Sequence, residues 1–66
     1  MKTVRLTAPW IDHLVHLPES GMGYQRVNIR LKRGRVLRDV MVFNAEECQV
    51  EESFEPEEIE DVELVR

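Results

Sequence analysis

Alternating residues between Val27 and Leu31 place the strongest constraint on what this chain can fold into. Val27, Ile29 and Leu31 are apolar, and the residues between them are polar. Because successive side chains of a strand point to opposite faces, the pattern predicts a strand buried on one side. Arg33-Gly34 follows and predicts a tight turn in which the glycine takes a positive φ. We therefore expect a β-hairpin here.

The second half of this hairpin is rich in strand-forming residues, but its alternation is broken. We expect Leu37 to point inward, opposite Leu31 across a three-residue loop. Val40 and Val42 then point inward only if one extra residue is inserted before them. The pattern therefore predicts a β-bulge at Arg38-Asp39, which would bend the strand as a small barrel requires.

Short apolar runs predict three further strands and one single-turn helix. Val4 and Leu6 alternate near the start, and Cys48 alternates with Val50 after a predicted turn at residues 44–47. Pro56 is expected to open one helical or 3₁₀ turn, because proline and acidic residues suit the first positions of a helix. The three strands are expected over residues 2–6, from 48 to 50 with an extension toward 54, and over 61–65.

A short helix is expected over residues 8–17, with Thr7 as its N-cap and Pro18 ending it. At 100° per residue the apolar side chains of this segment fill one arc of roughly 160°. The polar residues fall on the opposite arc. The apolar set is Trp10, Ile11, Leu14, Val15 and Leu17, and the polar set is Asp12, His13 and His16.

Together, Val27–Val36, Val40–Asn44 and Ile59–Val65 give a strand, a glycine turn, a bent strand and a closing strand. This order resembles the small SH3-like barrels, and the short helix ahead of the strands makes it similar to the Sm-like group. The stretch from Val27 to Val65, which contains the matching segments, covers about 40 of the 66 residues. The fold class implied is mainly β, a barrel of about five short strands with a short N-terminal helix; an α+β arrangement is the alternative.

The chain departs from the Sm-like pattern at the positions that bind RNA in that family. Arg38 stands where a second glycine is usual, and the Val65-Arg66 end replaces the closing Arg-Gly signature. Asn44, Glu47 and Cys48 occupy the positions of the Asp and the Met-Asn pair that help to bind RNA bases. The resemblance therefore implies the barrel without the RNA pocket, and no binding residues are taken from it.

Length and composition favour one small domain, residues 1–66, in a reducing compartment. Hydrophobic residues make up 42% of the chain, which is adequate for a folded core. The lone Cys48 cannot form an internal disulfide and is expected to be a buried core thiol. No apolar run predicts a signal peptide or a membrane span of about 20 residues. We expect a cytoplasmic protein without a membrane partner.

Charge is divided unevenly along the chain. Residues 1–45 hold eight basic and three acidic residues, a net charge of +5, whereas residues 46–66 hold one basic and ten acidic residues, a net charge of −9. This asymmetry predicts internal pairing, head-to-tail association of copies, or two surfaces with different partners.

Two kinds of candidate site follow from the charged residues. Asp12, His13 and His16 are spaced so that they could hold Zn²⁺ on one helix face, but no further Cys or His cluster supports a metal or cofactor. An exposed polar face is the preferred interpretation. The basic hairpin, residues 26–38, could follow a phosphate backbone, or it could be a solvated face that pairs with the acidic half. Its candidate binding residues are Arg26, Arg30, Lys32, Arg33, Arg35 and Arg38.

No residue pattern points to catalysis. Ser20 and Ser53 lie in polar segments without a base nearby, and the many glutamates form no tuned pair. The sequence therefore predicts a non-catalytic binding or assembly module that associates with another protein or with itself. Binding of RNA or single-stranded DNA through the basic hairpin is the alternative.

Overall fold

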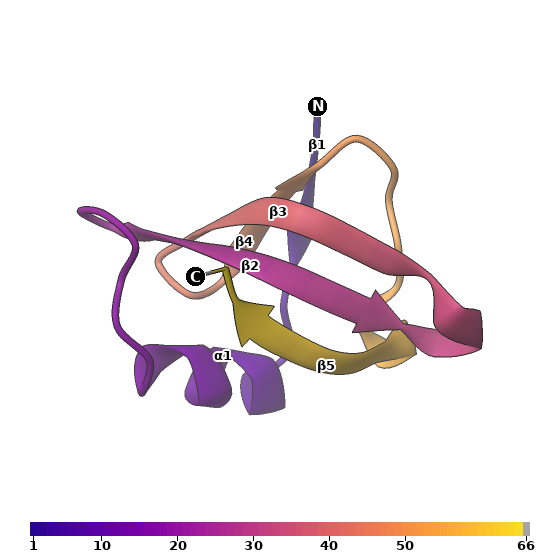
Figure 1. Ribbon diagram of the computed structural model, residues 1–66, viewed down its shortest axis with the longest axis horizontal. Helices are drawn as coiled ribbons and strands as arrows, with labels where there is room; N and C mark the ends of the chain where they lie inside the picture. Colours follow the sequence, from indigo (N-terminus) through magenta and orange to yellow (C-terminus); the bar gives the residue numbers. More distant parts are fainter. Residues whose placement is uncertain (66) are drawn as a thin grey trace.

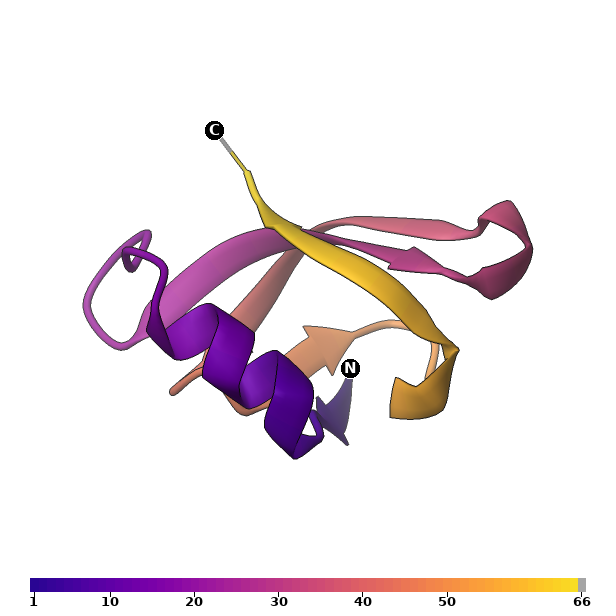
Figure 2. The ribbon, with the colours of Figure 1, turned by 90° about the horizontal axis from the view of Figure 1, so that it is seen from below.

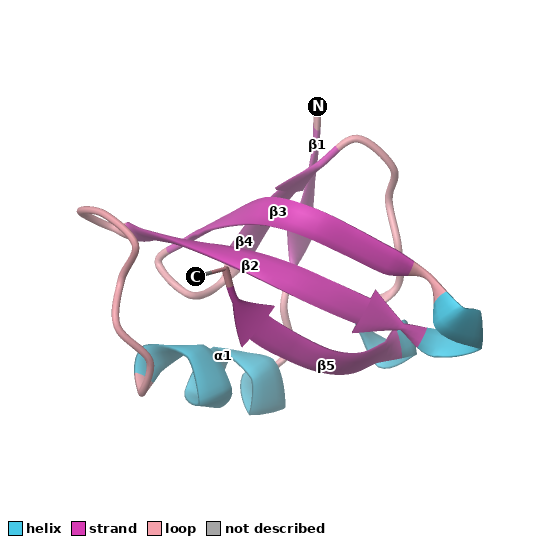
Figure 3. Ribbon diagram, viewed as in Figure 1, coloured by secondary structure: helices cyan, strands magenta, loops and turns pink. Residues whose placement is uncertain are grey.

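Two eight-residue strands, β2 (Tyr24–Leu31) and β3 (Val36–Phe43), form the hairpin at the centre of the structure. The structure is a computed structural model, and it describes residues 1–65. Figures 1 and 3 show the other elements around this hairpin. They are β1 (Lys2–Arg5), α1 (Ala8–Val15), β4 (Glu47–Val50), β5 (Ile59–Leu64) and two single 3₁₀ turns at Lys32–Gly34 and Pro56–Glu58.

The five strands form one antiparallel sheet in the order β1-β4-β3-β2-β5. The expected class, mainly β with five short strands and one short helix near the N-terminus, is confirmed. β1 and β5 are the two edges of the sheet, and no pairing between them closes a barrel within residues 1–65. The sheet is therefore curved but open.

The predicted bulge is present in β3. Asn28 on β2 lies opposite two residues, Arg38 and Asp39, because the pairing shifts by one residue at this point. Asp39 has a φ of +56°, and its N–H donates a 2.9 Å hydrogen bond to Oδ1 of Asn28. Arg26 Nε donates a second hydrogen bond, of 2.7 Å, to Oδ1 of Asp39. Two side chains of β2 thus hold the bulge.

The hairpin turn has the expected three residues, but one predicted pair is wrong. Leu31 N–H donates to the carbonyl of Arg35 at 2.7 Å, and Gly34 takes the predicted positive φ, +77°. Leu37 lies opposite Ile29, not opposite Leu31. The reason is that three residues in the turn leave Arg35 as the direct partner of Leu31.

The buried side chains come from the alternating positions of the strands and from one helix residue. Val62 and Ile59 on β5 and Leu14 on α1 join the inward residues of the hairpin. Phe54 is buried as well, although β4 ends at Val50, before the expected extension toward this residue. One hydrophobic cluster results, and its fully buried side chains are Leu14, Val27, Ile29, Leu31, Val42, Cys48 and Val62.

Helix α1 covers the side of the sheet that carries the buried side chains. It lies below the sheet in Figure 1 and in front of it in Figure 2. The helix follows Thr7 as predicted, but it ends at Val15, earlier than expected. Leu14 is fully buried, whereas Val15 is 58% exposed, so the prediction that Val15 belongs to the packed face is wrong. A helix of two turns brings only a narrow line of side chains against the sheet.

A buried polar residue, Gln25, fixes the end of α1. Its side chain is 3% exposed, and it is the one buried polar residue among residues 1–65. Nε2 donates to the carbonyls of Leu14 at 2.9 Å, Leu17 at 3.2 Å and Pro18 at 3.3 Å. The last carbonyls of a helix lack partners inside the helix. Leu17 N–H supplies one to Leu14, and Gln25 adds a donor from the neighbouring strand to Leu14 and to the two carbonyls beyond the helix.

Replacement of Gln25 by Leu should lower the free energy of unfolding by about 2 kcal/mol, because the part-buried carbonyls of Leu17 and Pro18 lose their donor while volume is nearly kept. Gln49→Leu is the matched control, since Gln49 bonds only to the exposed hydroxyl of Thr3. Urea unfolding followed by circular dichroism measures both. Equal effects of the two substitutions would contradict the proposed role of Gln25.

Candidate functional site

Arg26, one of the six candidate cations, has a structural role. Its hydrogen bond to Asp39 holds the bulge, raises the pKa of Arg26 and lowers the pKa of Asp39 from their ordinary values. Asn28, the neighbouring polar residue on the same face, accepts the bulge N–H. Neither side chain is free to bind a ligand without releasing the bulge.

Two further cations lie beside acidic residues of the second half of the chain. Arg30 is 3.9 Å from Glu60 and 3.9 Å from Asp61, and Arg35 is 3.6 Å from Glu52. All of these groups are solvent-exposed or half-buried, so each pair contributes little to stability. The contacts nevertheless lower the positive potential on this part of the hairpin.

The remaining three candidates, Lys32, Arg33 and Arg38, are exposed and make no ion pair within 4.0 Å in the part of the chain that the structure describes. Lys32 and Arg33 belong to the turn, which projects away from α1 in Figures 1 and 2. The basic hairpin therefore has three cations in ion pairs and, within residues 1–65, three without; of the latter, Lys32 and Arg33 lie at the tip and Arg38 lies at the bulge.

The residues considered for Zn²⁺ do not come together. His13 Nε2 lies 2.9 Å from the carbonyl oxygen of Val62, and His16 Nδ1 lies 2.7 Å from the carbonyl oxygen of Asp12. Across residues 1–65, no group of three or more His, Cys, Asp or Glu side chains could hold a metal ion. His13 is exposed, as the sequence predicted, and its ring also bridges α1 to β5, because the helix lies against the edge of that strand.

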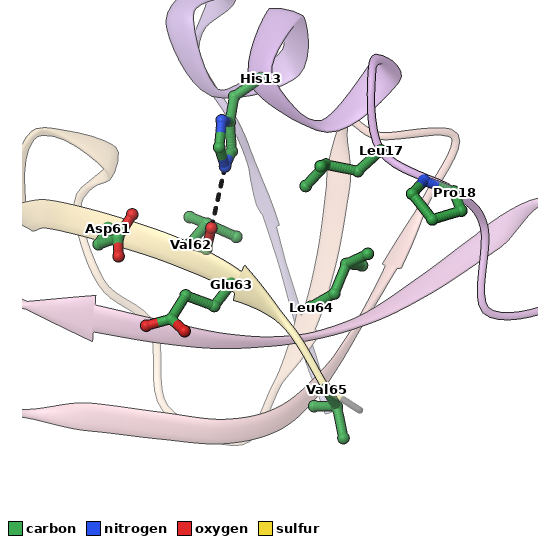
Figure 4. Close-up of a pocket in the computed structure, with 8 residues that line it drawn as sticks. All are labelled: His13, Leu17, Pro18, Asp61, Val62, Glu63, Leu64 and Val65. Carbon is green, nitrogen blue, oxygen red and sulfur yellow. Dashed lines mark hydrogen bonds between the residues drawn. The ribbon is translucent and has the colours of Figure 1, made fainter.

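A groove runs between α1 and β5, as Figure 4 shows. Leu17 and Pro18 form one wall after the end of the helix, and Leu64 faces them from the strand. His13 crosses the groove at one end through its bond to Val62. We call this feature the β5 groove; its lining residues are His13, Leu17, Pro18, Asp61, Val62, Glu63, Leu64 and Val65.

The groove contains the free edge of a strand. Val65 N–H donates to the carbonyl of Arg26 at 2.9 Å, so by alternation the backbone groups of Asp61 and Glu63 also point toward β2. Those of Val62 and Leu64 point away from β2 into the groove. The contact of His13 with the Val62 carbonyl agrees with this direction. Within residues 1–65, the N–H groups of Val62 and Leu64 have no hydrogen-bond acceptor.

The side chains of β5 alternate in the same way. Val62 is buried and Leu64 half-buried, so the strand is apolar on the side that faces α1. Asp61 and Glu63 lie on the outer face, opposite Arg30 and Asn28 of β2. The β5 groove thus combines an apolar interior with an acidic outer rim.

Sequence reasoning identified the strand but missed the groove. The alternation of Val62 and Leu64 predicts a half-buried strand, and the acidic residues between them predict a solvated face. Nothing local indicates that β5 is an edge strand or that His13 reaches its backbone. Both depend on which strands pair.

Cys48 is not a candidate nucleophile. The side chain is fully buried on β4, and burial raises the pKa of its thiol to about 12. The thiolate is the reactive form, so at pH 8 only about one molecule in ten thousand carries it. The interpretation of Cys48 as a core residue is confirmed.

Cys48 should therefore resist a disulfide reagent such as DTNB at pH 8 in the folded protein. Absorbance at the wavelength of the released thiolate measures the rate. The rate should rise by orders of magnitude in denaturing urea, which exposes the same thiol. Fast labelling without denaturant would show that the strand opens readily.

No helix among residues 1–65 has the length and apolar character needed to cross a membrane. Comparison of the chain with protein-family models, with curated proteins and with solved structures finds no match, so its similarity to Sm-like barrels stays a prediction.

Proposed function

We propose that this chain is a non-catalytic protein-association module that binds an extended segment along the free edge of β5, within the β5 groove. The observation that carries the proposal is the outward direction of the Val62 and Leu64 backbone groups beside an apolar wall. Addition of a strand to an exposed sheet edge is a recurrent mode of peptide binding, in which main-chain hydrogen bonds supply affinity.

The side chains around the edge define the segment that would fit. Residues that face α1 would contact Leu17 and Leu64, so apolar side chains suit these positions. Residues of the segment that face away from α1 would lie beside Asp61 and Glu63. Basic side chains suit these positions, because opposite charges in neighbouring strands attract. The matching segment is extended and alternates apolar with basic residues.

His13 competes with the incoming strand. A carbonyl can only accept, so His13 Nε2 is the donor to Val62, and it occupies the acceptor that a bound strand would use. A segment would pair first with Leu64 and then replace His13. The helix thereby protects an exposed edge from indiscriminate pairing.

A peptide of alternating valine and lysine should bind the full chain and shift the amide signals of Val62 and Leu64 in ¹H–¹⁵N spectra. Glu63→Lys should weaken binding by about threefold or more, because an attractive cross-strand pair becomes repulsive. Glu57→Lys is the matched control, since Glu57 is an exposed acid on the 3₁₀ turn outside the groove. Absence of shifts at millimolar peptide would contradict the proposal.

A cytoplasmic location is part of the proposal and rests on a chain with one cysteine, Cys48, and no possible internal disulfide.

Nucleic-acid binding is the second candidate, and three exposed cations of the hairpin favour it. Lys32, Arg33 and Arg38 are exposed and free of ion pairs among residues 1–65. On the other hand, Arg26 holds the bulge, and Arg30 and Arg35 lie near acids that oppose a phosphate backbone.

If this second function holds, a fluorescent single-stranded RNA should bind at low salt with log K falling against log[salt] at a slope of about −2, the value for three phosphate contacts. Replacement of Lys32, Arg33 and Arg38 by Ser should abolish the polarisation change. An unchanged affinity of this triple variant, or no signal for the natural chain, would exclude these three cations as a nucleic-acid site.

A further inference from the structure

We propose that the segment bound in the β5 groove is β1 of a second copy of the chain, paired parallel to β5. This inference rests on the proposed function, and it names the partner of the same edge. Its basis is that the two edge strands, one at each end of the sheet, have matching alternation and opposite charge.

β1 offers a free edge of its own. Leu6 N–H donates to the carbonyl of Glu46 at 2.7 Å, so the backbone groups of Leu6 and Val4 point toward β4. By alternation, those of Thr3 and Arg5 point away from the sheet. β1 pairs with β4 alone, so this side of the strand is open within the described residues.

The direction of pairing follows from the positions of the side chains. The backbone N–H and C=O groups of Val62, Thr3 and Arg5 all point away from the sheet, at its free edges. The side chain of Val62 lies on the buried face of the sheet, whereas those of Thr3 and Arg5 lie on the outer face. Antiparallel pairing would set Thr3 or Arg5 directly opposite Val62, so the buried face of one copy would continue into the outer face of the other. Parallel pairing sets Val62 opposite Val4 and keeps the buried faces aligned.

In this parallel register the side chains match along the whole strand. Val62 lies opposite Val4 of the second copy, and Leu64 lies opposite Leu6 of the second copy. On the outer face, Glu63 lies opposite Arg5 of the second copy. Apolar pairs thus alternate with an opposite-charge pair, an arrangement that stabilises neighbouring strands.

The backbone hydrogen bonds are also accounted for. In a parallel pair each residue bonds to the two residues that flank its opposite partner. Val62 N–H would donate to Thr3 of the second copy, and Leu64 N–H would donate to Arg5 of the second copy. Arg5 N–H of the second copy would replace His13 as the donor to the Val62 carbonyl. The orphan donors of the β5 groove are satisfied, and the one native bond that is lost is exchanged for another.

Charge disfavours the symmetric pairing of β5 with itself. A two-fold β5 pair centred on Glu63 would set this carboxylate against its own copy, with Asp61 close by, and like charges directly opposite are destabilising. Arg5 already lies 3.2 Å from Glu46 and 3.3 Å from Glu47. These pairs are exposed, so Arg5 can also approach Glu63. The joined copies would still have one free β1 and one free β5, and further copies could add.

The test is disulfide trapping between two variants of the full chain. Thr3→Cys and Asp61→Cys place thiols on directly opposite outer-face positions, and neighbouring strands lie about 4.8 Å apart, within reach of a disulfide. Both sites are on the outer face, and this pair leaves Arg5 and Glu63 intact. Cys48 is buried and does not compete. Mixed at tens of micromolar under mild oxidation, the two variants should give a covalent heterodimer as the main product.

A charge exchange makes the test specific for the register. Adding Glu63→Arg to the Asp61→Cys variant should reduce the heterodimer at least threefold, and adding Arg5→Glu to the Thr3→Cys variant should restore it. Arg33→Cys mixed with Asp61→Cys is the control for random collision, because Arg33 lies at the hairpin tip.

Each other result overturns the inference. A main product formed by Asp61→Cys alone would indicate β5–β5 pairing, and one formed by Thr3→Cys alone would indicate β1–β1 pairing. If the valine–lysine peptide shifts Val62 and Leu64 but the mixed variants trap no heterodimer, the groove binds a different protein and only the inference fails. If the peptide also leaves these amides unmoved, the proposed function fails with it.

Discussion

The bulge at Asp39 is the constraint on which the sheet depends. It limits one neighbour of the central hairpin and is spanned by the other: β4 pairs with β3 only beyond the bulge, at Met41–Phe43, whereas β5 pairs with β2 from Leu31 on the turn side, past the bulge, to Val27. The left-handed backbone of Asp39 would be costly without support. Asn28 and Arg26 supply that support from the opposite strand. Edge strand β5 is therefore held by β2 along the bulge, and edge strand β1 joins the sheet through β4 on the opposite side.

The position of α1 depends on a second polar contact. Gln25 projects from β2 into the core and donates to the carbonyls of Leu14, Leu17 and Pro18, so a shift of the helix along the sheet would break these bonds and leave the buried Gln25 side chain without its acceptors. This contact fixes the segment from Leu14 to Pro18 and, with it, one wall of the β5 groove. His13 then reaches the Val62 carbonyl from the same helix. The groove is thus a consequence of how a short helix is held.

The basic first part and the acidic second part of the chain partly neutralise each other in the fold. Acids from the second half of the chain lie beside Arg5, Arg30 and Arg35, which agrees with internal complementarity. Charges without an ion pair among residues 1–65 remain at Lys32 and Arg33 of the turn and at Glu63 on the outer face of β5. A small core and open edges of different charge suit a protein that completes its sheet with another chain. The same features give no reason to expect catalysis.

The sequence by itself determined the features that depend on neighbouring residues. Alternation from Val27 to Leu31 predicts the strand, Gly34 the turn, and the broken pattern before Val40 the bulge, because strand periodicity and positive φ are local properties. Only the tertiary structure decided that Val15 lies outside the packed side of α1, that Gln25 is a core donor, and that His13 contacts β5. These contacts join residues that are far apart in the sequence, so no local periodicity predicts them. Which strands lie at the edges is decided by the pairing of the whole sheet. The same limit applies to the β5 groove, since its edge exists only once β2 has taken the other side of β5.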